Sequence, residues 1–230
     1  MSDTSVILEA KEKHTATIIF LHGLGDVGES WADALSDVRS LLPHVRIICP
    51  TAPQSRVTIN GGARMTSWHD IKSLQAIDDE GKEQFSGVEE SVAIVKSLIE
   101  SEIQSGIAAN RIVLGGFSQG AALSVRTAFT LDVTLAGVVC LSGYLVQKSA
   151  IVAALNDANK ATPLFVGHGT ADAVVAFEAG KRVHATLSEA GVAAELHVYE
   201  RMGHSSSQRE MQELAEFFTS VLPAAISDEL

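Results

Sequence analysis

Residues 112–120 read Ile-Val-Leu-Gly-Gly-Phe-Ser-Gln-Gly, and residues 121–125 continue as Ala-Ala-Leu-Ser-Val. An apolar run leads into a serine held between two glycines, and a helix-forming stretch follows at once, which is typical of a nucleophile elbow. Gly116 and Gly120 remove side chains where such a turn is tight and where the helix packs close to the strand. The pattern therefore predicts a strained Ser118 at the end of a strand, exposed for covalent catalysis.

The length and charge of the chain limit the class of protein. The chain has 230 residues, of which 46% are hydrophobic and 20% charged, and its formal net charge is −11. This length allows one sizeable core, so we expect a single domain over residues 1–230. The negative charge disfavours nucleic acid and anionic membrane surfaces as partners. No apolar run approaches the ~20 residues of a membrane span. We expect no stable membrane insertion and, at most, transient membrane contact.

Short apolar runs recur along the chain and predict the strands. They are continuous rather than alternating, a pattern typical of parallel strands that are covered on both faces. The runs lie at residues 17–21, 45–48, 112–114, 137–141, 163–166 and 195–199. Helical periodicity separates them, most clearly over residues 88–103, and other helices are predicted to begin near Trp31, Gln119, Phe177 and Ser206. Alternating strands and helices predict an α/β fold with a doubly wound, mostly parallel sheet and ligands at the carboxyl ends of its strands.

One connection, at approximately residues 51–85, is unusually long for a compact domain. Long irregular segments usually carry function or are disordered. Its first part holds four apolar side chains that we expect to face a substrate: Met65, Trp68, Ile71 and Leu74. Residues 78–83 are acidic apart from a glycine and a lysine, and we expect a surface turn there.

Two further residues complete a catalytic set with Ser118. A serine hydroxyl needs a base within hydrogen-bond reach and a carboxylate that orients the base. Asp172 follows the predicted strand at residues 163–166, and His204 follows the last predicted strand. We predict that His204 is the general base and Asp172 its orienting acid. The order serine, aspartate, histidine is the one found in α/β-hydrolases.

A tetrahedral intermediate also needs backbone N–H donors aimed at its oxyanion. One is expected from Gln119, the residue after the nucleophile, and the other from the loop after an early strand. Residues 22–26, His-Gly-Leu-Gly-Asp, follow the first predicted strand directly. We therefore predict the Leu24 and Gln119 amides as the oxyanion hole and interpret His22 as a residue that shapes the loop.

Other residues of catalytic type are interpreted as structural. His168 lies on the strand end of the acid and supports its turn, and Ser142 lacks the preceding glycine of an elbow. His69 and Asp70 are adjacent, so their side chains diverge on an extended segment. The eight histidines show no metal-ligand spacing, and we expect no metal site.

The cysteines and termini suggest a location. Cys49 and Cys140 lie in or at the end of apolar runs, so we expect reduced core thiols and a cytoplasmic protein. Residues 1–4 show no start of a signal peptide. Residues 227–230, Ser-Asp-Glu-Leu, resemble an ER-retention signal, but without an entry signal we interpret them as an acidic tail.

Taken together, these motifs resemble a known family, the acyl-protein thioesterases, with the related small carboxylesterases and lysophospholipases of the α/β-hydrolase fold. The stretches that carry the resemblance are residues 20–26, 50–53, 57–62, 67–71, 115–120 and 202–205. The resemblance spans nearly the whole chain. It implies an α/β-hydrolase fold with helices on both faces of the sheet and no large cap domain.

The resemblance also implies a reaction: hydrolysis of S-palmitoyl thioesters on proteins, or depalmitoylation, with carboxylesterase and lysophospholipase side activity. Ser118, Asp172 and His204 match the family triad, and Leu24 and Gln119 match its oxyanion positions. The family uses no cofactor. Its acyl tunnel corresponds to residues 65–74 and to three residues after the triad aspartate: Val174, Val175 and Phe177.

Two departures from the family pattern concern the substrate and the membrane. Ala173 stands where the family often has a proline directly after the aspartate, which leaves the loop less rigid. Ser2 replaces an N-terminal cysteine that some members acylate. We expect S-acylated proteins or small acyl esters as substrates, and a monomer or weak homodimer. The alternatives are a short-chain carboxylesterase with the same triad and a non-catalytic acyl-chain-binding protein.

Overall fold

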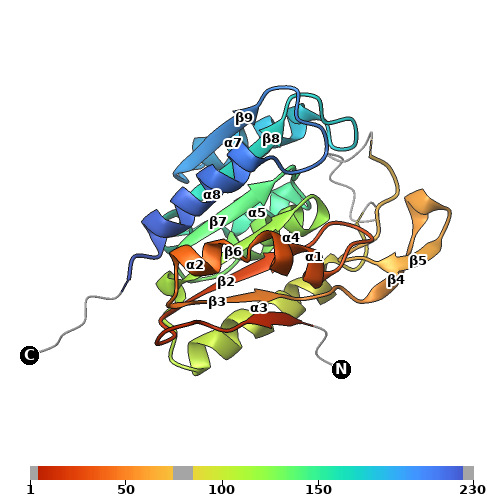
Figure 1. Cartoon of the computed structure of the whole chain (residues 1–230). Coiled ribbons are helices and arrows are strands. Elements are labelled where there is room, and N and C mark those ends of the chain that lie inside the picture. The colour runs from red at the N-terminus through yellow and green to blue at the C-terminus, as the bar shows by residue number, and fades with distance from the viewer. Residues whose placement is uncertain (1–4, 75–84, 225–230) are drawn as a thin grey trace, which may run out of the picture.

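A mixed sheet runs through the middle of the molecule (Figure 1). The computed structural model describes residues 5–74 and 85–224, so the predicted turn at 78–83 and the two chain ends, with Ser2 and residues 227–230, lie outside the described residues. Within them the sheet has seven strands: β1 (Val6–Leu8), β2 (Ala16–Leu21), β3 (Val45–Cys49), β6 (Ile112–Phe117), β7 (Gly137–Leu141), β8 (Leu164–Gly169) and β9 (Ala194–Tyr199).

The strand order is β1-β3-β2-β6-β7-β8-β9. All neighbouring pairs are parallel except β1 with β3, which is antiparallel. The prediction of a mostly parallel, doubly wound sheet is confirmed, and each of the six predicted strands is present. Strand β1 was not predicted, because three residues are too few for a periodic signal. The carboxyl ends of β2, β6, β8 and β9 all meet at one edge of the sheet.

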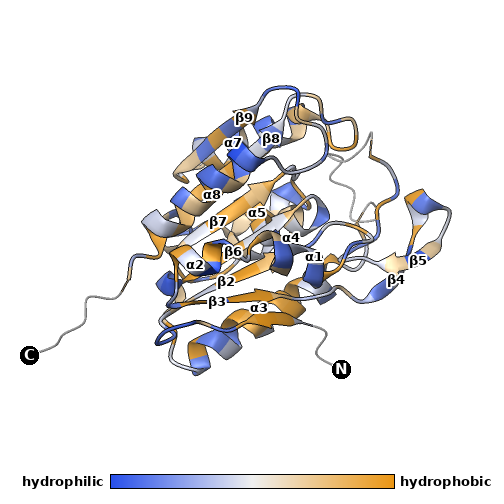
Figure 2. Ribbon diagram, viewed as in Figure 1, coloured by the Kyte–Doolittle hydropathy of each residue, from blue (hydrophilic) through white to orange (hydrophobic). Residues whose placement is uncertain are grey.

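Both faces of the sheet are buried, as the continuous apolar runs predicted. In β2, Ile18 and Phe20 pack into one core, while Ile19 and Leu21 pack into the other. Successive side chains of a strand point to opposite faces, so a strand covered twice needs apolar residues at every position. Figure 2 shows the result as strands that are hydrophobic along their length and helices that are hydrophilic on their outer surfaces.

Helices cover the two faces as separate layers (Figure 1). One layer contains α1 (Gly28–Ala34), α2 (Val38–Leu41) and α8 (Gln208–Val221). The other contains α3 (Val88–Gln104), α4 (Gln119–Ala128), α5 (Lys148–Ala154) and α7 (Phe177–Glu189), and the short α6 (Asp157–Lys160) precedes β8. The long predicted helices are confirmed, whereas the short α2, α5 and α6 gave too little periodicity to be recognised. Among the described residues, no helix is long and apolar enough to cross a bilayer.

The connection at residues 51–85 is more ordered than the sequence predicted. Within its described part, β4 (Gln54–Val57) and β5 (Ala63–Thr66) form an antiparallel hairpin, joined through a 3-10 turn, η1 (Thr58–Asn60). Gly61 and Gly62 both have positive φ angles, 65° and 76°, which close the turn at no steric cost. The hairpin projects from the edge of the sheet at which the strands end, to the right in Figure 1. A second 3-10 turn, η2 (Ala109–Arg111), leads into β6.

Candidate active site

Ser118 lies between β6 and α4 in a strained backbone conformation. Its φ of 54° and ψ of −116° fall outside the regions that serine ordinarily adopts. Its N–H donates to the Leu141 carbonyl oxygen at 2.8 Å, which ties the turn to the neighbouring strand. A Cβ on Gly116 would lie 2.5 Å from the Gly120 carbonyl carbon, and a Cβ on Gly120 would lie 2.3 Å from the Leu21 oxygen. The turn therefore requires glycine at both positions.

His204 contacts Ser118 on one side and Asp172 on the other. It lies in the loop between β9 and α8, and its Nε2 is 3.0 Å from the Ser118 Oγ. Its Nδ1 is 2.7 Å from the Asp172 Oδ2. A carboxylate only accepts hydrogen bonds, so Nδ1 carries the proton and Nε2 is free to accept from the serine hydroxyl. The Phe117 ring packs against the imidazole, with ring centroids 4.8 Å apart, and limits its movement.

Asp172 lies three residues beyond the end of β8, and its side chain is fully buried. The N–H groups of Val174 and Val175 both donate to its Oδ1 at 2.9 Å. Burial raises the pKa of Asp172, but donation from His168, His204 and the Val174 N–H outweighs burial and holds the pKa well below its usual value. The acid is therefore an anion throughout the physiological pH range, as an orienting group for a histidine must be.

Gln119 and Leu24 lie beside the serine, where the sequence predicted the oxyanion hole. Gln119 is the first residue of α4, and the first N–H groups of a helix have no partner within the helix. Leu24 follows β2 and lines the same pocket as Ser118 and His204. Both backbones thus approach the serine from elements that are anchored in the sheet.

The loop that carries Leu24 is held by His22. The His22 Nδ1 donates to the Gly23 carbonyl oxygen at 2.6 Å, and the Ala52 N–H donates to its Nε2 at 2.9 Å. Full burial lowers the pKa of this imidazole, which favours the neutral form that these two bonds require. His22 therefore positions the loop and has no free nitrogen for proton transfer.

The Gln119 side chain has a second role in the fold. Its Oε1 accepts from the Trp68 N–H at 2.8 Å, and its Nε2 donates to the His69 carbonyl oxygen at 2.7 Å. The Trp68 Nε1 in turn donates to the His22 carbonyl oxygen at 2.9 Å. These bonds tie the segment after the hairpin to the start of α4 and to the loop after β2. The sequence did not reveal this role of the glutamine side chain.

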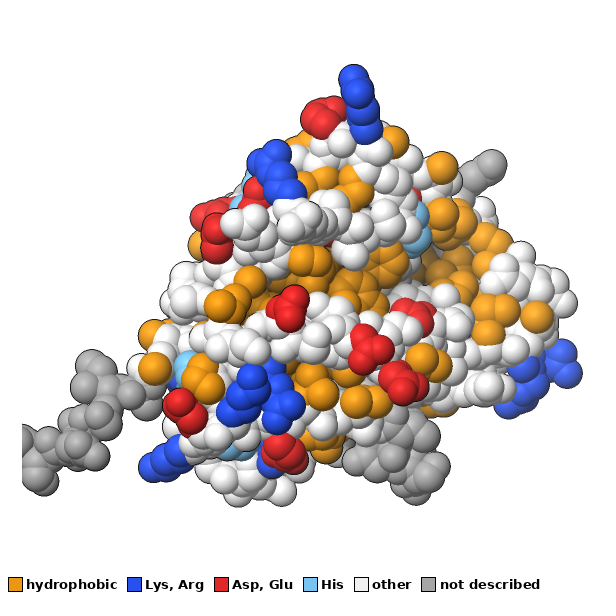
Figure 3. Space-filling model, in the orientation of Figure 1, with side chains coloured by type: hydrophobic (Ala, Val, Ile, Leu, Met, Phe, Trp, Pro, Cys, Tyr) orange, Lys and Arg blue, Asp and Glu red, His pale blue; other side chains and the backbone are white. Residues whose placement is uncertain are grey.

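An apolar pocket of 290 Å³ opens beside Ser118 and His204. Four of the predicted lining residues contribute to it: Ile71, Leu74, Val174 and Val175. Further wall residues, which the sequence did not identify, are Gly23, Asp26, Ile59, Asn60, Phe117 and Tyr144. In the space-filling view, hydrophobic side chains gather in a hollow above α1, on the side of the loops that follow β8 and β9 (Figure 3).

Three predicted lining residues lie elsewhere. Trp68 is 1% exposed and packs behind the pocket, because its indole N–H needs the His22 carbonyl as acceptor. Met65 lies on β5, where its sulfur accepts from the Asn60 Nδ2 at 3.2 Å. Phe177 begins α7, and its ring lies at a steep angle to the His168 ring, with ring centroids 6.0 Å apart.

Three other residues of catalytic type, Cys140, Ser142 and His69, lack the arrangement of partners found at Ser118. Burial raises the pKa of the Cys140 thiol to about 12, so it is not a nucleophile at neutral pH. Ser142 is fully buried and also has a positive φ, 47°, but no hydrogen-bond partner of its Oγ is described. His69 contacts the Tyr144 hydroxyl through Nε2 at 2.8 Å, while Asp70 accepts from the Thr58 N–H at 2.7 Å. The two side chains diverge, as predicted.

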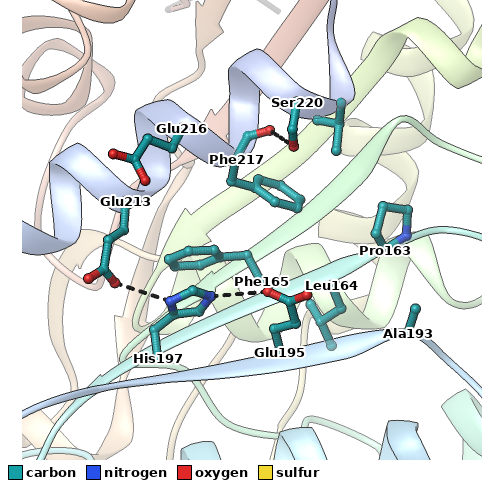
Figure 4. A pocket seen from close by; sticks show the side chains of 11 residues that line it. Pro163, Leu164, Phe165, Ala193, Glu195, His197, Glu213, Glu216, Phe217 and Ser220 are labelled. Carbon is teal, nitrogen blue, oxygen red and sulfur yellow. Dashed lines mark hydrogen bonds and ion pairs between the residues drawn. The ribbon is translucent and has the colours of Figure 1, made fainter.

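A second pocket, of 420 Å³, lies at the opposite edge of the sheet (Figure 4). It is lined by the beginnings of β8 and β9 and by α8. His197 there lies 3.1 Å from Glu213 through its Nδ1. The hydroxyl among its lining residues, that of Ser220, donates to the Phe217 carbonyl oxygen at 2.8 Å and faces no base. Although this pocket is larger, it lacks the serine, histidine and acid arrangement, so the pocket at Ser118 is the candidate active site.

Comparison with known proteins places the chain among enzymes of this kind. Residues 2–222 match the phospholipase/carboxylesterase family. The chain is 42% identical over 219 residues to acyl-protein thioesterase 1 of Yarrowia lipolytica, an alignment that covers 91% of this chain and 93% of that protein.

Two solved structures are similar over nearly their full length. Arabidopsis thaliana SOBER1 superposes with a TM-score of 0.82 at 33% identity, covering 90% of this chain and 99% of that one. Acyl-protein thioesterase 2 of Zea mays gives a TM-score of 0.81 at 30% identity, covering 95% and 98%. The fold expected from the sequence is confirmed, and within the described residues no large cap covers the sheet. The chain belongs to the phospholipase/carboxylesterase family of α/β-hydrolases, and it is a hydrolase.

Proposed function

We propose that this protein is a serine hydrolase that cleaves long-chain acyl thioesters on protein cysteines. The observation that carries the proposal is the hydrogen-bonded chain from Ser118 through His204 to Asp172 beside an apolar pocket. The relatives named acyl-protein thioesterase support the thioester as the bond that is cleaved.

In the proposed mechanism, the Ser118 Oγ attacks the acyl carbonyl carbon while its proton passes to the His204 Nε2. Asp172 stabilises the imidazolium that forms, and the Leu24 and Gln119 N–H groups donate to the oxyanion. The tetrahedral intermediate then expels the cysteine sulfur, which takes the proton from His204. Water, activated by the same imidazole, attacks the acyl-enzyme, and the fatty acid leaves as Ser118 regains its proton.

The apolar wall of the pocket supports a preference for acyl chains over polar groups. Each methylene that leaves water contributes about 0.8 kcal/mol, so several methylenes against Ile71, Leu74 and Val175 favour a longer chain by several kcal/mol. Because the pocket opens directly beside Ser118 and His204, the same site also supports a second candidate function, a carboxylesterase for shorter acyl chains with the same triad.

The remaining elements of the proposal concern partners and location. We propose S-acylated proteins and small acyl esters as substrates, in the cytoplasm, with at most transient membrane contact. The two cysteines are free and buried, as a reducing compartment permits. We propose a monomer or weak homodimer and one domain over the whole chain.

A substrate panel tests the proposal. Acetyl, butyryl, octanoyl and palmitoyl groups are offered both as thioesters of a cysteine-containing peptide and as oxyesters of the matched serine peptide, and kcat/KM is measured for each. We expect kcat/KM to rise with chain length and to be higher for thioesters. Fastest turnover on acetyl or butyryl oxyesters, with none on palmitoyl thioesters, would replace the thioesterase by the short-chain carboxylesterase.

A labelling experiment separates the enzyme from a non-catalytic acyl-chain binder. A fluorophosphonate probe reacts with an activated serine, and we expect labelling of the wild-type protein that disappears in Ser118→Ala. Ser124→Ala is a matched control, because Ser124 is a buried serine of α4 whose hydroxyl donates to the Gly120 carbonyl oxygen, away from the base. A folded wild-type protein that never labels would contradict catalysis.

A further inference from the structure

His168 is a fully buried imidazole beside the triad that the proposed mechanism does not use. It lies on β8, one residue before the strand ends, and four residues before Asp172. Its Nε2 lies 2.9 Å from the Val175 carbonyl oxygen and 3.4 Å from the Asp172 Oδ2. A single nitrogen therefore contacts both the catalytic acid and the wall of the acyl pocket.

The contacts of this nitrogen determine which tautomer His168 adopts. A carbonyl oxygen and a carboxylate both only accept hydrogen bonds, so Nε2 must carry the proton that lies between them. The Val175 oxygen accepts the hydrogen bond at 2.9 Å, and the Asp172 Oδ2 lies 3.4 Å from the same nitrogen, close enough for an electrostatic contact with its N–H. That same Asp172 Oδ2 is the atom that accepts from His204. His168 thus approaches the carboxylate at the oxygen that orients the base.

Both backbone groups of Val175, its N–H and its carbonyl, form hydrogen bonds with side chains at the end of β8. The Val175 N–H donates to the Asp172 Oδ1 at 2.9 Å, while the Val175 carbonyl accepts from His168. Val175 is therefore held by the acid and by the imidazole together, and it lines the pocket at Ser118. Residue 173 in this loop is alanine and does not restrict the backbone as a proline would. The side-chain bonds supply the restraint.

Gly180 on α7 provides the space for the His168 ring. A Cβ at residue 180 would lie 2.4 Å from the His168 Nδ1 and 2.9 Å from its Cγ. Glycine in the interior of a helix is otherwise unfavourable. Nδ1 has no hydrogen-bond partner among the described residues, so the ring is held from this side by packing alone. Glycine is a poorer helix former than alanine, but residue 180 must lack a side chain so that the imidazole fits.

We propose that His168 is a positioning residue of the reaction: its Nε2–H fixes the Asp172 carboxylate and the Val175 backbone in the orientation that His204 and the acyl chain require. The inference rests on the proposed triad. It assigns to His168 no contact with substrate and no proton transfer.

Two substitutions of His168 separate the donated hydrogen bond from the volume of the ring. His168→Leu fills the space without a donor, and we expect the second-order rates of fluorophosphonate labelling and of p-nitrophenyl acetate hydrolysis to fall by roughly 10- to 100-fold, since small misplacements of catalytic groups have effects of this size. His168→Gln places an amide N–H near the position of Nε2 and should retain rates within about fivefold of wild type. Equal loss in both variants would contradict the proposal.

Gly180→Ala tests the same contact from the helix. Its added methyl group displaces the ring without removing any hydrogen-bonding group, so we expect the labelling rate to fall as in His168→Leu. If Gly180→Ala instead raises the melting temperature and leaves the rates unchanged, the position of the ring does not matter and the inference is wrong. His184→Leu makes the same replacement at a histidine of α7 that does not line the pocket at Ser118, and it is the matched control with unchanged rates.

A double-mutant cycle distinguishes positioning from a general structural defect. Residues that act as a unit in catalysis are strongly non-additive. His168→Leu should therefore change the residual labelling rate of Asp172→Ala by no more than about twofold. The full 10- to 100-fold loss in that background would show that His168 acts independently of Asp172 and would overturn the inference. Failure of the wild-type protein to label would instead contradict the proposed triad, so the two failures are distinguishable.

Discussion

At the scale of single residues, the proposed chemistry depends on which atom of His204 carries the proton. Asp172 receives the His204 Nδ1–H at 2.7 Å and two backbone N–H groups on its other oxygen. We expect Asp172→Asn to lower kcat by about 10⁴-fold, because an amide group at Oδ2 donates to the imidazole and favours the wrong tautomer.

The same substitution is expected to leave the fold intact, since the amide oxygen still accepts from Val174 and Val175. Hydrolysis of p-nitrophenyl acetate measures kcat, and thermal unfolding serves as the control. A folded Asp172→Asn protein with a kcat within tenfold of wild type would show that the acid does not orient the base.

At the scale of elements, the turn at Ser118 and the loop after β2 pack against each other at Gly120. A Cβ there would lie 2.3 Å from the Leu21 carbonyl oxygen and 2.5 Å from that of His22, which are backbone atoms and cannot move aside. We expect Gly120→Ala to destabilise the protein by at least about 3 kcal/mol, comparable to severe overpacking of a core.

Gly62→Ala is the matched control for Gly120→Ala. Gly62 has a φ of 76° in the open hairpin turn, so the added methyl group meets only conformational strain, about 1–2 kcal/mol. Urea unfolding measures both variants. A Gly120→Ala protein as stable as Gly62→Ala would mean that α4 does not pack against the loop after β2 as described.

The elements explain which predictions from the sequence succeeded. Ser118, Asp172 and His204 each follow a strand, and parallel strands bring their carboxyl ends to one edge, so chain order alone placed the three residues together. The lining of the pocket depends instead on how the hairpin folds back. Ile59 reaches it because its N–H donates to the Ile71 carbonyl oxygen at 2.9 Å. No local pattern encodes that bond.

The burial of individual polar groups could also not be predicted from the sequence. Trp68 was predicted to face the substrate because it is large and apolar, but its single N–H found an acceptor at His22, behind the pocket. Residues 207–210, Ser-Gln-Arg-Glu, read as the start of a helix, and the Ser207 Oγ does accept from the Glu210 N–H. The pattern does not reveal that the Glu210 carboxyl lies fully buried.

At the scale of the whole molecule, Glu210 makes stability depend on pH. Burial raises the pKa of its carboxyl from 4.5 to about 8, and neither oxygen has a hydrogen-bond partner among the described residues. The folded state therefore binds this proton more tightly than the unfolded chain. Its contribution to stability is complete below pH 4.5 and is lost as the pH rises to about 8.

We expect Glu210→Gln to raise the free energy of unfolding by a few kcal/mol at pH 8, since each pKa unit corresponds to about 1.4 kcal/mol. At pH 5 the same substitution should have little effect. Glu216→Gln, an exposed position on the same helix, is the control. The pH dependence contributed by Asp172 has the opposite sign. Because its pKa is lowered in the folded state, its ionised carboxylate stabilises the fold above pH 3.8, and this stabilisation is lost as the pH falls further. A pH-independent difference between Glu210→Gln and wild type would contradict the buried proton.

The loop after β8 carries Asp172, the proposed acid of the triad, and, two and three residues later, part of the pocket wall. A substitution of Val174 or Val175 that changes the accepted acyl-chain length therefore also disturbs the Asp172 carboxylate, because that carboxylate accepts hydrogen bonds from their backbone N–H groups. The part of the wall formed by Ile59 and Ile71 makes no described hydrogen bond to Ser118, Asp172 or His204. Laboratory evolution of substrate range should accumulate its tolerated changes on that wall, and natural variants with altered range should be sought there first.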